Sequence, residues 1–169
     1  MTTIGEVFTH ELKDLFSAET QLIKALPKMA KAAKSPELAK AFEDHLKETE
    51  KQKERLTQIG EILGEKLTGE TCDAMKGLIE EGEGVIKDFE PSFARDAALI
   101  AVAQRVEHYE IAAYGCAEEM AKVLGHKEVV KILNEIQQEE GDADKLLTKV
   151  AVKNVLPEAL KESKTPVAK

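Results

Sequence analysis

Apolar side chains recur at three- and four-residue steps along most of the chain, which is the spacing that lines one face of an α-helix. Near the N-terminal end this pattern predicts one helix from about residue 3 to 33. A second helix is expected from Ser35, a capping residue followed by proline, to about residue 64. Two long amphipathic helices therefore open the chain.

The same pattern predicts two more long helices, from about Ser92 to Gly125 and from about 126 to 152, with a short helical piece after them. Residues 64 to 91 contain five glycines and are expected to form a long connection with a short helix around 72 to 81 and a further turn after it. Short loops within each helix pair and one long connection between the pairs predict two antiparallel hairpins packed as an all-α four-helix bundle.

A weak internal repeat supports the two-hairpin arrangement. Laying Glu19 on Glu110 aligns the second half of the chain with the first without a gap. Sequence identity between the halves is low, and chance accounts for about half of the agreement because amphipathic helices share much of this pattern whatever their origin. The apolar positions that coincide include Leu15 with Val106, Met29 with Met120, Leu38 with Val129 and Leu56 with Leu147.

Length and composition restrict the class of protein. The 169 residues suit one domain, expected over 1–160, with a polar tail over 161–169. A net charge of −8 argues against nucleic acid or an anionic membrane surface as a partner. No apolar run approaches the length of a membrane span, and the N-terminal stretch lacks the features of a signal peptide, so a cytoplasmic location is expected. Cys72 and Cys116 are isolated and are expected to be reduced, unligated thiols.

Each of the four predicted helices carries an acidic residue in the phase of its apolar stripe. These residues are Glu19, Glu48, Glu110 and Glu140, and each falls near the middle of its helix. In an antiparallel bundle the middles of the helices share one cross-sectional layer, so the four side chains should meet. Polar residues in neighbouring turns join this layer: His45, Gln52, Glu107 and Asp144.

Burying such a group of acids is costly, because each carboxylate loses solvation and the charges repel one another. Protons or cations must compensate the charge, and divalent metal ions do so while using the oxygens as ligands. A single glutamate in an apolar stripe is more often a hydrated boundary residue, whereas four together favour a metal site. Arg55 is a further source of positive charge, but it lies two turns from Glu48 and is expected to pair with Asp14.

The approximate two-fold relation between the hairpins suggests a site for two divalent metal ions. Glu48 and Glu140 are predicted to bridge the ions, and Glu19 and Glu110 to be terminal ligands. The remaining positions are assigned to Gln52, Glu107 and Asp144.

Several alternatives remain open at this site. A small rotation of the last long helix would replace Glu140 and Asp144 by Glu139 and Asp142. His45 is more often a core or boundary histidine than a ligand. Glu107 is either exposed or part of the second metal position. Tyr109 and Tyr114 flank the layer, and a core tyrosine with a bonded hydroxyl describes each better than a redox-active one.

Four stretches form a distinctive set of motifs: LKDLFSAE (12–19), HLKETEKQKERL (45–56), VEHYEIAAYG (106–115) and EE-x-x-x-D-x-x-L (139–147). As a set they resemble a known family, the bacterial YciE/YciF-like proteins of the ferritin-like superfamily. The resemblance covers nearly the whole chain. It implies a ferritin-like four-helix bundle with a dinuclear metal centre, a homodimer, and an association with stress responses.

One departure from related metal sites concerns the ligand types. Di-iron carboxylate bundles place Glu-x-x-His on two helices, whereas Lys51 and Ala143 stand three residues after Glu48 and Glu140. An oxygen-rich site fits manganese as well as iron. Three functions follow for testing: an oxidoreductase acting on oxygen or peroxide, a metal-binding stress protein, and a metal-free helical interaction module. The sequence assigns no catalytic residue and no organic cofactor.

Overall fold

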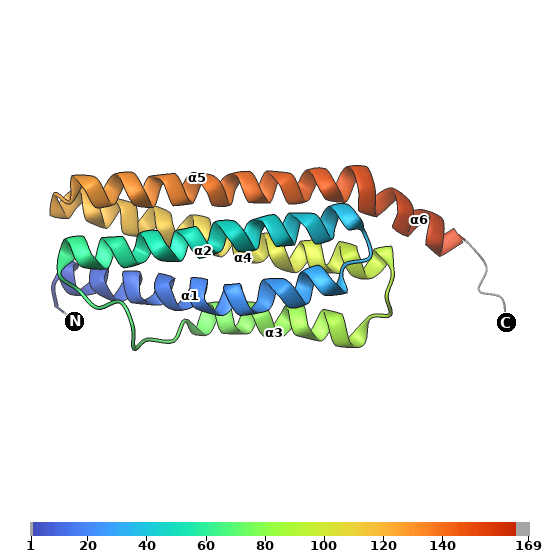
Figure 1. Cartoon of the computed structure of the whole chain (residues 1–169), viewed down its shortest axis with the longest axis horizontal. Coiled ribbons are helices and arrows are strands. Elements are labelled where there is room, and N and C mark those ends of the chain that lie inside the picture. The colour runs from blue at the N-terminus through green and yellow to red at the C-terminus, as the bar shows by residue number, and fades with distance from the viewer. Residues whose placement is uncertain (1, 165–169) are drawn as a thin grey trace.

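The computed structural model describes residues 2–164, and helices account for most of them (Figure 1). No strand occurs within this range, so the predicted all-α class is confirmed. None of its helices is both long and apolar enough to cross a membrane. The elements are α1 (Ile4–Ala32), α2 (Pro36–Leu63), α3 (Asp73–Asp88), α4 (Phe93–Leu124), α5 (Lys127–Val150), the π-helix η1 (Ala151–Val155) and α6 (Leu156–Lys164).

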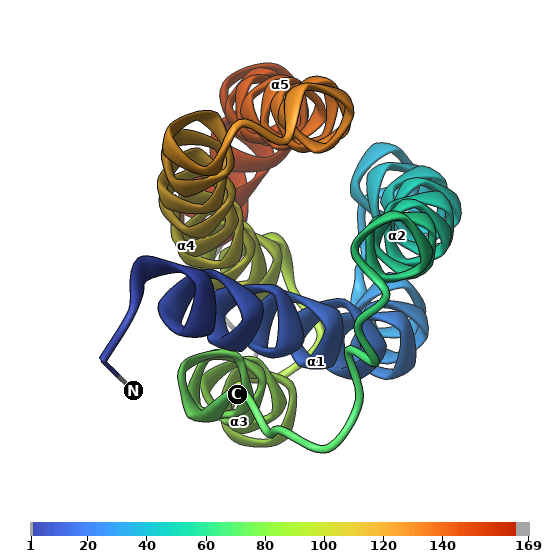
Figure 2. The same cartoon turned by 90° about the vertical axis from the view of Figure 1, so that its left-hand side faces the viewer.

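Helices α1, α2, α4 and α5 form the bundle. In Figure 1 α1 and α2 run antiparallel as one hairpin and α4 and α5 as the other, and Figure 2 shows the four helices arranged around a common axis. The first hairpin meets the second through α1 against α4 and α2 against α5. The predicted arrangement of two antiparallel hairpins is confirmed.

Local sequence signals define most helix boundaries. The Thr3 side chain accepts a hydrogen bond from the Glu6 N–H and the Glu6 carboxylate reaches back to the Thr3 N–H, which caps α1. The Ser35 hydroxyl accepts from the Leu38 N–H at the start of α2. Gly64 and Gly125 end α2 and α4 with φ of 69° and 81°, a left-handed conformation that glycine adopts without steric cost.

Helix α3 is longer than the sequence predicted. The expected short helix at 72–81 is a helix of 16 residues that packs on the outer side of α1 and α4 (Figure 2). Its glycines weaken the helical signal, since glycine costs about 1 kcal/mol relative to alanine in a helix. Packing compensates: Met75 is completely buried, and the bare backbone of Gly82 sits against Val102. Tertiary contacts therefore stabilise a helix that local propensity disfavours.

The C-terminal end also differs from expectation. Residues 161–164, predicted to belong to a polar tail, are the last turn of α6, and residues 165–169 lie outside the described range. The helix changes to π geometry over Ala151–Val155, just before Pro157, which has no N–H to donate to the preceding turn. Glu162 anchors α6 because its carboxylate accepts a hydrogen bond from the Phe93 N–H at 2.9 Å and pairs with Lys34.

The core consists of two apolar clusters rather than one. One surrounds Leu12, Leu15 and Leu133, and the other surrounds Leu22, Phe42 and Leu99. On α1, Leu15 belongs to the first cluster and Leu22 to the second, and Glu19 lies between them. A buried polar layer therefore separates two dry regions of the bundle.

Candidate metal centre

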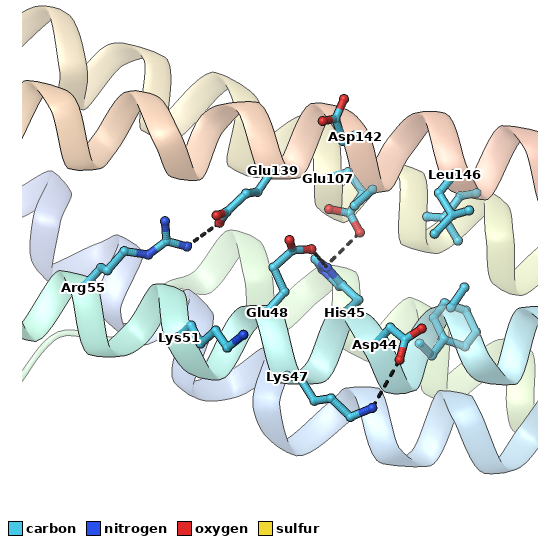
Figure 3. A pocket seen from close by; sticks show the side chains of 14 residues that line it. Asp44, His45, Lys47, Glu48, Lys51, Arg55, Glu107, Glu139, Asp142 and Leu146 are labelled. Atoms are coloured by element: carbon cyan, nitrogen blue, oxygen red, sulfur yellow. Dashed lines mark hydrogen bonds and ion pairs between the residues drawn. The ribbon is translucent and has the colours of Figure 1, made fainter.

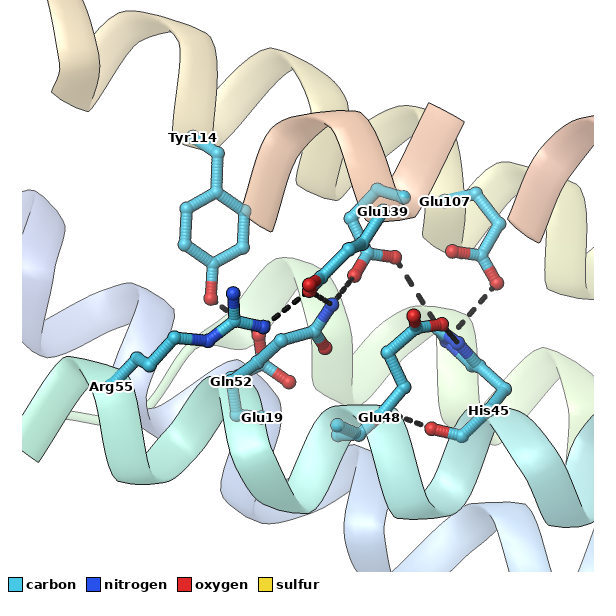
Figure 4. Close-up of polar contacts among 10 residues, drawn as sticks. Glu19, His45, Glu48, Gln52, Arg55, Glu107, Tyr114 and Glu139 are labelled. Carbon is cyan, nitrogen blue, oxygen red and sulfur yellow. Dashed lines mark hydrogen bonds and ion pairs between the residues drawn. The ribbon is translucent and has the colours of Figure 1, made fainter. Parts of the chain in front are cut away.

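All four bundle helices contribute polar side chains to this middle layer (Figure 4). Glu19 comes from α1, and His45, Thr49 and Gln52 come from successive turns of α2. Helix α4 supplies Glu107 and Glu110, and α5 supplies Glu140. Each of these residues is buried, and Glu19, Gln52, Glu110 and Glu140 are fully removed from solvent. The structure thus brings together five of the seven residues assigned to the metal site: Glu19, Gln52, Glu107, Glu110 and Glu140.

Four members of the layer form a compact donor cluster. His45, Glu107, Glu110 and Glu140 each offer one nitrogen or oxygen atom, and these atoms lie within 4.8 Å of one another. Both ring nitrogens of His45, both oxygens of Glu110, Oε2 of Glu107 and Oε2 of Glu140 make no hydrogen bond. Buried polar atoms are paired in the great majority of cases, and an unpaired one costs about 1–3 kcal/mol. The cluster therefore has the donor atoms of a cation site, and most of these atoms have no hydrogen-bond partner.

Glu19 and Gln52 extend the cluster on one side. Tyr114 donates its hydroxyl hydrogen to Oε1 of Glu19, whereas Oε2 of Glu19 is unpaired. The Gln52 amide donates to Glu140 and, at 3.2 Å, to Glu139, which leaves the Gln52 oxygen free. Two further oxygens therefore face this layer without a partner.

Both tyrosines have bonded hydroxyls, as the sequence interpretation favoured. Tyr114 is fully buried beside Glu19, and half-buried Tyr109 donates to Asp14. The Tyr109 hydroxyl also lies 3.0 Å from the sulfur of Cys72, the buried thiol that caps α3. Cys72 and Cys116 are both free.

The electrostatics of the layer follow from its burial. Desolvation raises the pKa values of Glu19, Glu107 and Glu110 well above their usual range, and repulsion from neighbouring acids, Glu140 among them, raises them further. Arg55 acts in the opposite direction on the pKa of Glu19. Without a cation, these carboxyl groups retain protons that exposed glutamates would lose.

His45 takes a larger part than the sequence interpretation favoured. Its Nε2 atom lies 3.3 Å from Glu107 Oε1 and 3.9 Å from Glu140 Oε2, and its Nδ1 lies 3.7 Å from Glu48 Oε2. The signal that could have identified it is its spacing: His45, Thr49 and Gln52 follow one another at steps of four and three, which places them on one face of α2.

Glu48 and Asp144 were assigned to the metal site, but the structure does not bring them into the buried layer. Glu48 precedes Thr49 on α2, so the turn of the helix carries it off the buried face, and its side chain is 39% exposed. Asp144 faces α4 instead, where it accepts a hydrogen bond from Gln104 at 2.9 Å and lies 3.4 Å from His108.

Arg55 pairs with Glu139 rather than with the predicted partner Asp14. The prediction was wrong because Arg55 faces across to α5, while Asp14 accepts a hydrogen bond from the Tyr109 hydroxyl of α4. The burial of the two adjacent glutamates decides the orientation of α5. Glu140 is fully buried and faces the layer, whereas Glu139 lies at its edge, where it meets Arg55. Asp142, the other alternative, is exposed and pairs with Lys145.

A groove between α2 and α5 leads from the surface to the donor cluster (Figure 3). Its cavity has a volume of about 480 Å³, and His45 and Glu107 lie on its inner wall. Glu48, Lys51, Arg55 and Glu139 are placed around it. The buried layer is therefore connected to solvent on the side where α2 faces α5.

Comparison with known proteins supports the fold and places the chain in a family. It is 47% identical to Protein YciF of Escherichia coli (strain K12) over 156 residues, which cover 92% of this chain and 94% of that protein. The crystal structure of that stress protein superimposes with a TM-score of 0.89, covering 92% of this chain and 99% of that one.

Two more solved structures have the same fold. YcfI from Rhodopseudomonas palustris is 41% identical, with a TM-score of 0.86 over 89% of this chain and 96% of that chain. A protein from Xanthomonas campestris is 20% identical, with a TM-score of 0.74 over 95% of this chain and 99% of that chain, which shows the fold alone. The family described as "Domain of unknown function (DUF892)" matches residues 3–160, and the chain belongs to it.

Proposed function

We propose that this protein binds two divalent metal ions, iron or manganese, in the buried layer between its two hairpins. The observation that carries this proposal is the donor cluster: His45, Glu107, Glu110 and Glu140 converge within 4.8 Å, are buried, and hold atoms without hydrogen-bond partners. Protons would neutralise the carboxyl groups and let Glu107 or Glu110 donate to Glu140, whereas divalent cations would bind the unpaired oxygens and a ring nitrogen of His45 together.

The charges of the layer support two ions rather than one. Glu19, Glu107, Glu110 and Glu140 carry four negative charges when ionised, and two divalent cations balance them. His45 and Gln52 are neutral donors, so the set contains many oxygens and a single imidazole. Oxygen-rich sites with little nitrogen suit manganese and iron better than the later transition metals.

Glu140 is the best candidate for a bridging ligand. It lies between His45 on one side and Gln52 on the other, and it also faces Glu107 and Glu110. His45, Glu107 and Glu110 would complete one metal position, while Glu19 and Gln52 would contribute to the second. In this assignment Glu140 keeps its predicted bridging role, whereas Glu48 does not.

The related Escherichia coli protein is called a stress protein, and we extend that role to this chain. Paired iron or manganese ions supply redox chemistry towards oxygen or peroxide when they are bound. The protein's own contribution is a buried layer between two apolar clusters, with carboxyl groups that take up or release protons as charge changes beside them. Tyr114 holds Glu19 in place on one side of that layer.

Metal content is the direct test. Protein purified without chelator should contain about two equivalents of iron or manganese per chain by elemental analysis, and the Glu110→Ala variant should contain far less. Glu50→Ala is the matched control, since Glu50 is an exposed glutamate of α2. Absence of metal in the unmodified protein, together with no binding of added Mn²⁺ or Fe²⁺, would leave a metal-free helical interaction module as the function. If metal is bound, consumption of added peroxide by the metal-loaded protein distinguishes an enzyme from a protein that only binds metal.

The homodimer implied by the family resemblance also remains a proposal. Val152, Leu156 and Leu160 are exposed at four-residue steps along η1 and α6, which forms an apolar stripe that a second copy would cover. Sedimentation should show a species of twice 18.6 kDa, and Leu156→Glu should shift it to the monomer. A monomer at micromolar concentration for the unmodified chain would contradict this proposal.

A further inference from the structure

The groove between α2 and α5 reaches the donor cluster directly. His45 is 8% exposed, lines the groove, and has two ring nitrogens without hydrogen bonds. Glu107 lies beside it on the same wall, and its Oε2 is also unpaired. By contrast, the cavity between α1, α3 and α4 is lined mainly by apolar side chains and touches no member of the cluster. Polar access to the layer is therefore on the α2–α5 side.

The charges on the groove wall favour a cation over an anion. Five carboxyl groups and three cationic side chains line it, and four of the acids carry a negative charge when Glu107 keeps its proton. Two of the cations are already paired, Lys47 with Asp44 at 3.2 Å and Arg55 with Glu139. Lys51 is the third, and it is exposed. A groove with a net negative charge and low-dielectric walls concentrates cations near its inner end.

Glu48 occupies the position between the outer groove and the cluster. Figure 3 shows it extending from α2 towards α5, next to the His45 ring. Its Oε2 atom lies 3.7 Å from His45 Nδ1, and its side chain is 39% exposed, so one carboxylate faces both solvent and the cluster. Neighbouring acids of the groove have ion-pair partners, as Asp44 has Lys47 and Glu139 has Arg55. Glu48 instead has the His45 ring as its neighbour.

We propose that the α2–α5 groove is the path by which a divalent cation reaches the buried cluster, and that Glu48 transfers the ion by turning between the groove and His45. This inference rests on the proposed metal-binding function. It explains why the acid predicted to bridge two metals stands half-exposed at the edge of the layer: its role is in uptake, and the ions reside on the fully buried carboxylates.

The experiment compares the rate of metal uptake with the final amount bound. Metal-free full-length protein is mixed with Co²⁺ in a stopped-flow instrument, and the visible absorption of bound cobalt is followed to completion. Glu48→Gln removes one charge while keeping the shape of the side chain. It should slow uptake roughly tenfold, the lower end of the range for electrostatic focusing, with the final stoichiometry unchanged. Glu50→Gln, an exposed acid of the same helix, should load at the rate of the unmodified protein.

A second variant tests the sign of the charge effect. Lys51→Gln removes a positive charge from the groove and should accelerate Co²⁺ uptake about threefold at low ionic strength, with a smaller effect in high salt. Slower uptake in this variant would show that the charge of the groove does not attract the cation and would overturn the proposal.

The outcomes for Glu48→Gln are distinct. An unchanged rate would exclude Glu48 from uptake, and a lost equivalent of cobalt would make it a resident ligand instead. Either result overturns the proposed transfer role while leaving metal binding intact. Failure of the unmodified protein to bind cobalt, manganese or iron would refute the metal-binding function itself, and the uptake path with it.

Discussion

The two hairpins of the bundle share a register but contribute different chemistry to the layer between them. A shift of 91 residues lays Glu19 of α1 on Glu110 of α4, and both are fully buried. The other members of the layer do not match under this shift. Glu107 falls on Phe16, Glu140 on Thr49, His45 on Ile136 and Gln52 on Ala143.

The asymmetry divides the layer into a side with three carboxyl groups and a side with one. The α4–α5 hairpin supplies Glu107, Glu110 and Glu140, whereas the α1–α2 hairpin supplies one carboxylate, Glu19, together with neutral donors. The repeat therefore reproduces the backbone frame without reproducing the ligands. Substitutions at matched positions of the two hairpins should consequently have unequal effects.

The largest difference is expected between Glu140→Ala and its matched variant Thr49→Ala. Removing Glu140 takes away the carboxylate shared by the cluster, so metal affinity should fall by more than the roughly 10–100-fold typical of outer partners of a metal site. The Thr49 hydroxyl donates to the His45 carbonyl, at 2.9 Å, and its removal should leave the metal content unchanged. Metal titrations of both variants check this. Two tightly bound ions in Glu140→Ala would contradict the assignment.

The pH dependence of the metal-free protein should report the desolvation of the acids on the α4–α5 side and the repulsion between them. The folded-state pKa values of Glu107 and Glu110 are raised from 4.5, so the native state binds protons that the unfolded chain has released. These two groups therefore make their full contribution to the free energy of unfolding below about pH 4.5. As the pH rises towards the raised pKa values, the free energy of unfolding falls by about 1.4 kcal/mol per pH unit for each proton that the native state retains.

Urea unfolding of chelator-treated protein between pH 5 and 8 measures this slope. Glu110→Gln removes one of the titrating groups and should flatten it, and saturating metal should also reduce it. A stability that rises with pH over this interval would show that the acids are compensated without protons or metal.

The two tyrosine hydroxyls should differ in their contribution to stability. Tyr114 donates to Glu19 within the buried layer, so Tyr114→Phe leaves a buried oxygen unpaired and should cost about 1–3 kcal/mol. Tyr109→Phe removes a half-buried bond to Asp14 and should cost less. For a chain of this size each kcal/mol corresponds to roughly 2–4 °C in melting temperature. Equal losses in the two variants would contradict the difference in burial.

The smallest effect is expected for Asp144→Asn. This change keeps a hydrogen-bonding oxygen for Gln104 and lies outside the buried layer, so the free energy of unfolding should change by less than about 0.5 kcal/mol and the metal content should not change. Loss of metal in this variant would mean that α5 presents Asp144, as well as Glu140, to the site.

The sequence allowed much of the fold to be predicted. The four long helices, their pairing into hairpins, and the burial of Glu19, Glu110 and Glu140 all follow from apolar periodicity and capping residues. The full length of α3 did not, because its glycines weaken the local signal while contacts with α1 and α4 stabilise the helix. The partner of Arg55 was also missed, since it depends on which helix faces α2 across the groove.

What the sequence determined by itself is therefore the phase of each helix: which apolar residues share its buried stripe, and that an acid stands at mid-helix in the stripes of α1, α4 and α5. The tertiary structure decided which residues at the edge of a stripe turn inwards. Adjacent residues of a helix differ by about 100° in direction, and those four apart by about 40°, so a modest rotation against a neighbouring helix moves a boundary side chain in or out. That rotation places His45 inside the layer and Glu48 in the groove, and it turns Asp144 towards α4. The rotation of a helix depends on how side chains from distant parts of the sequence pack together, and the local spacing of residues carries no information about that packing.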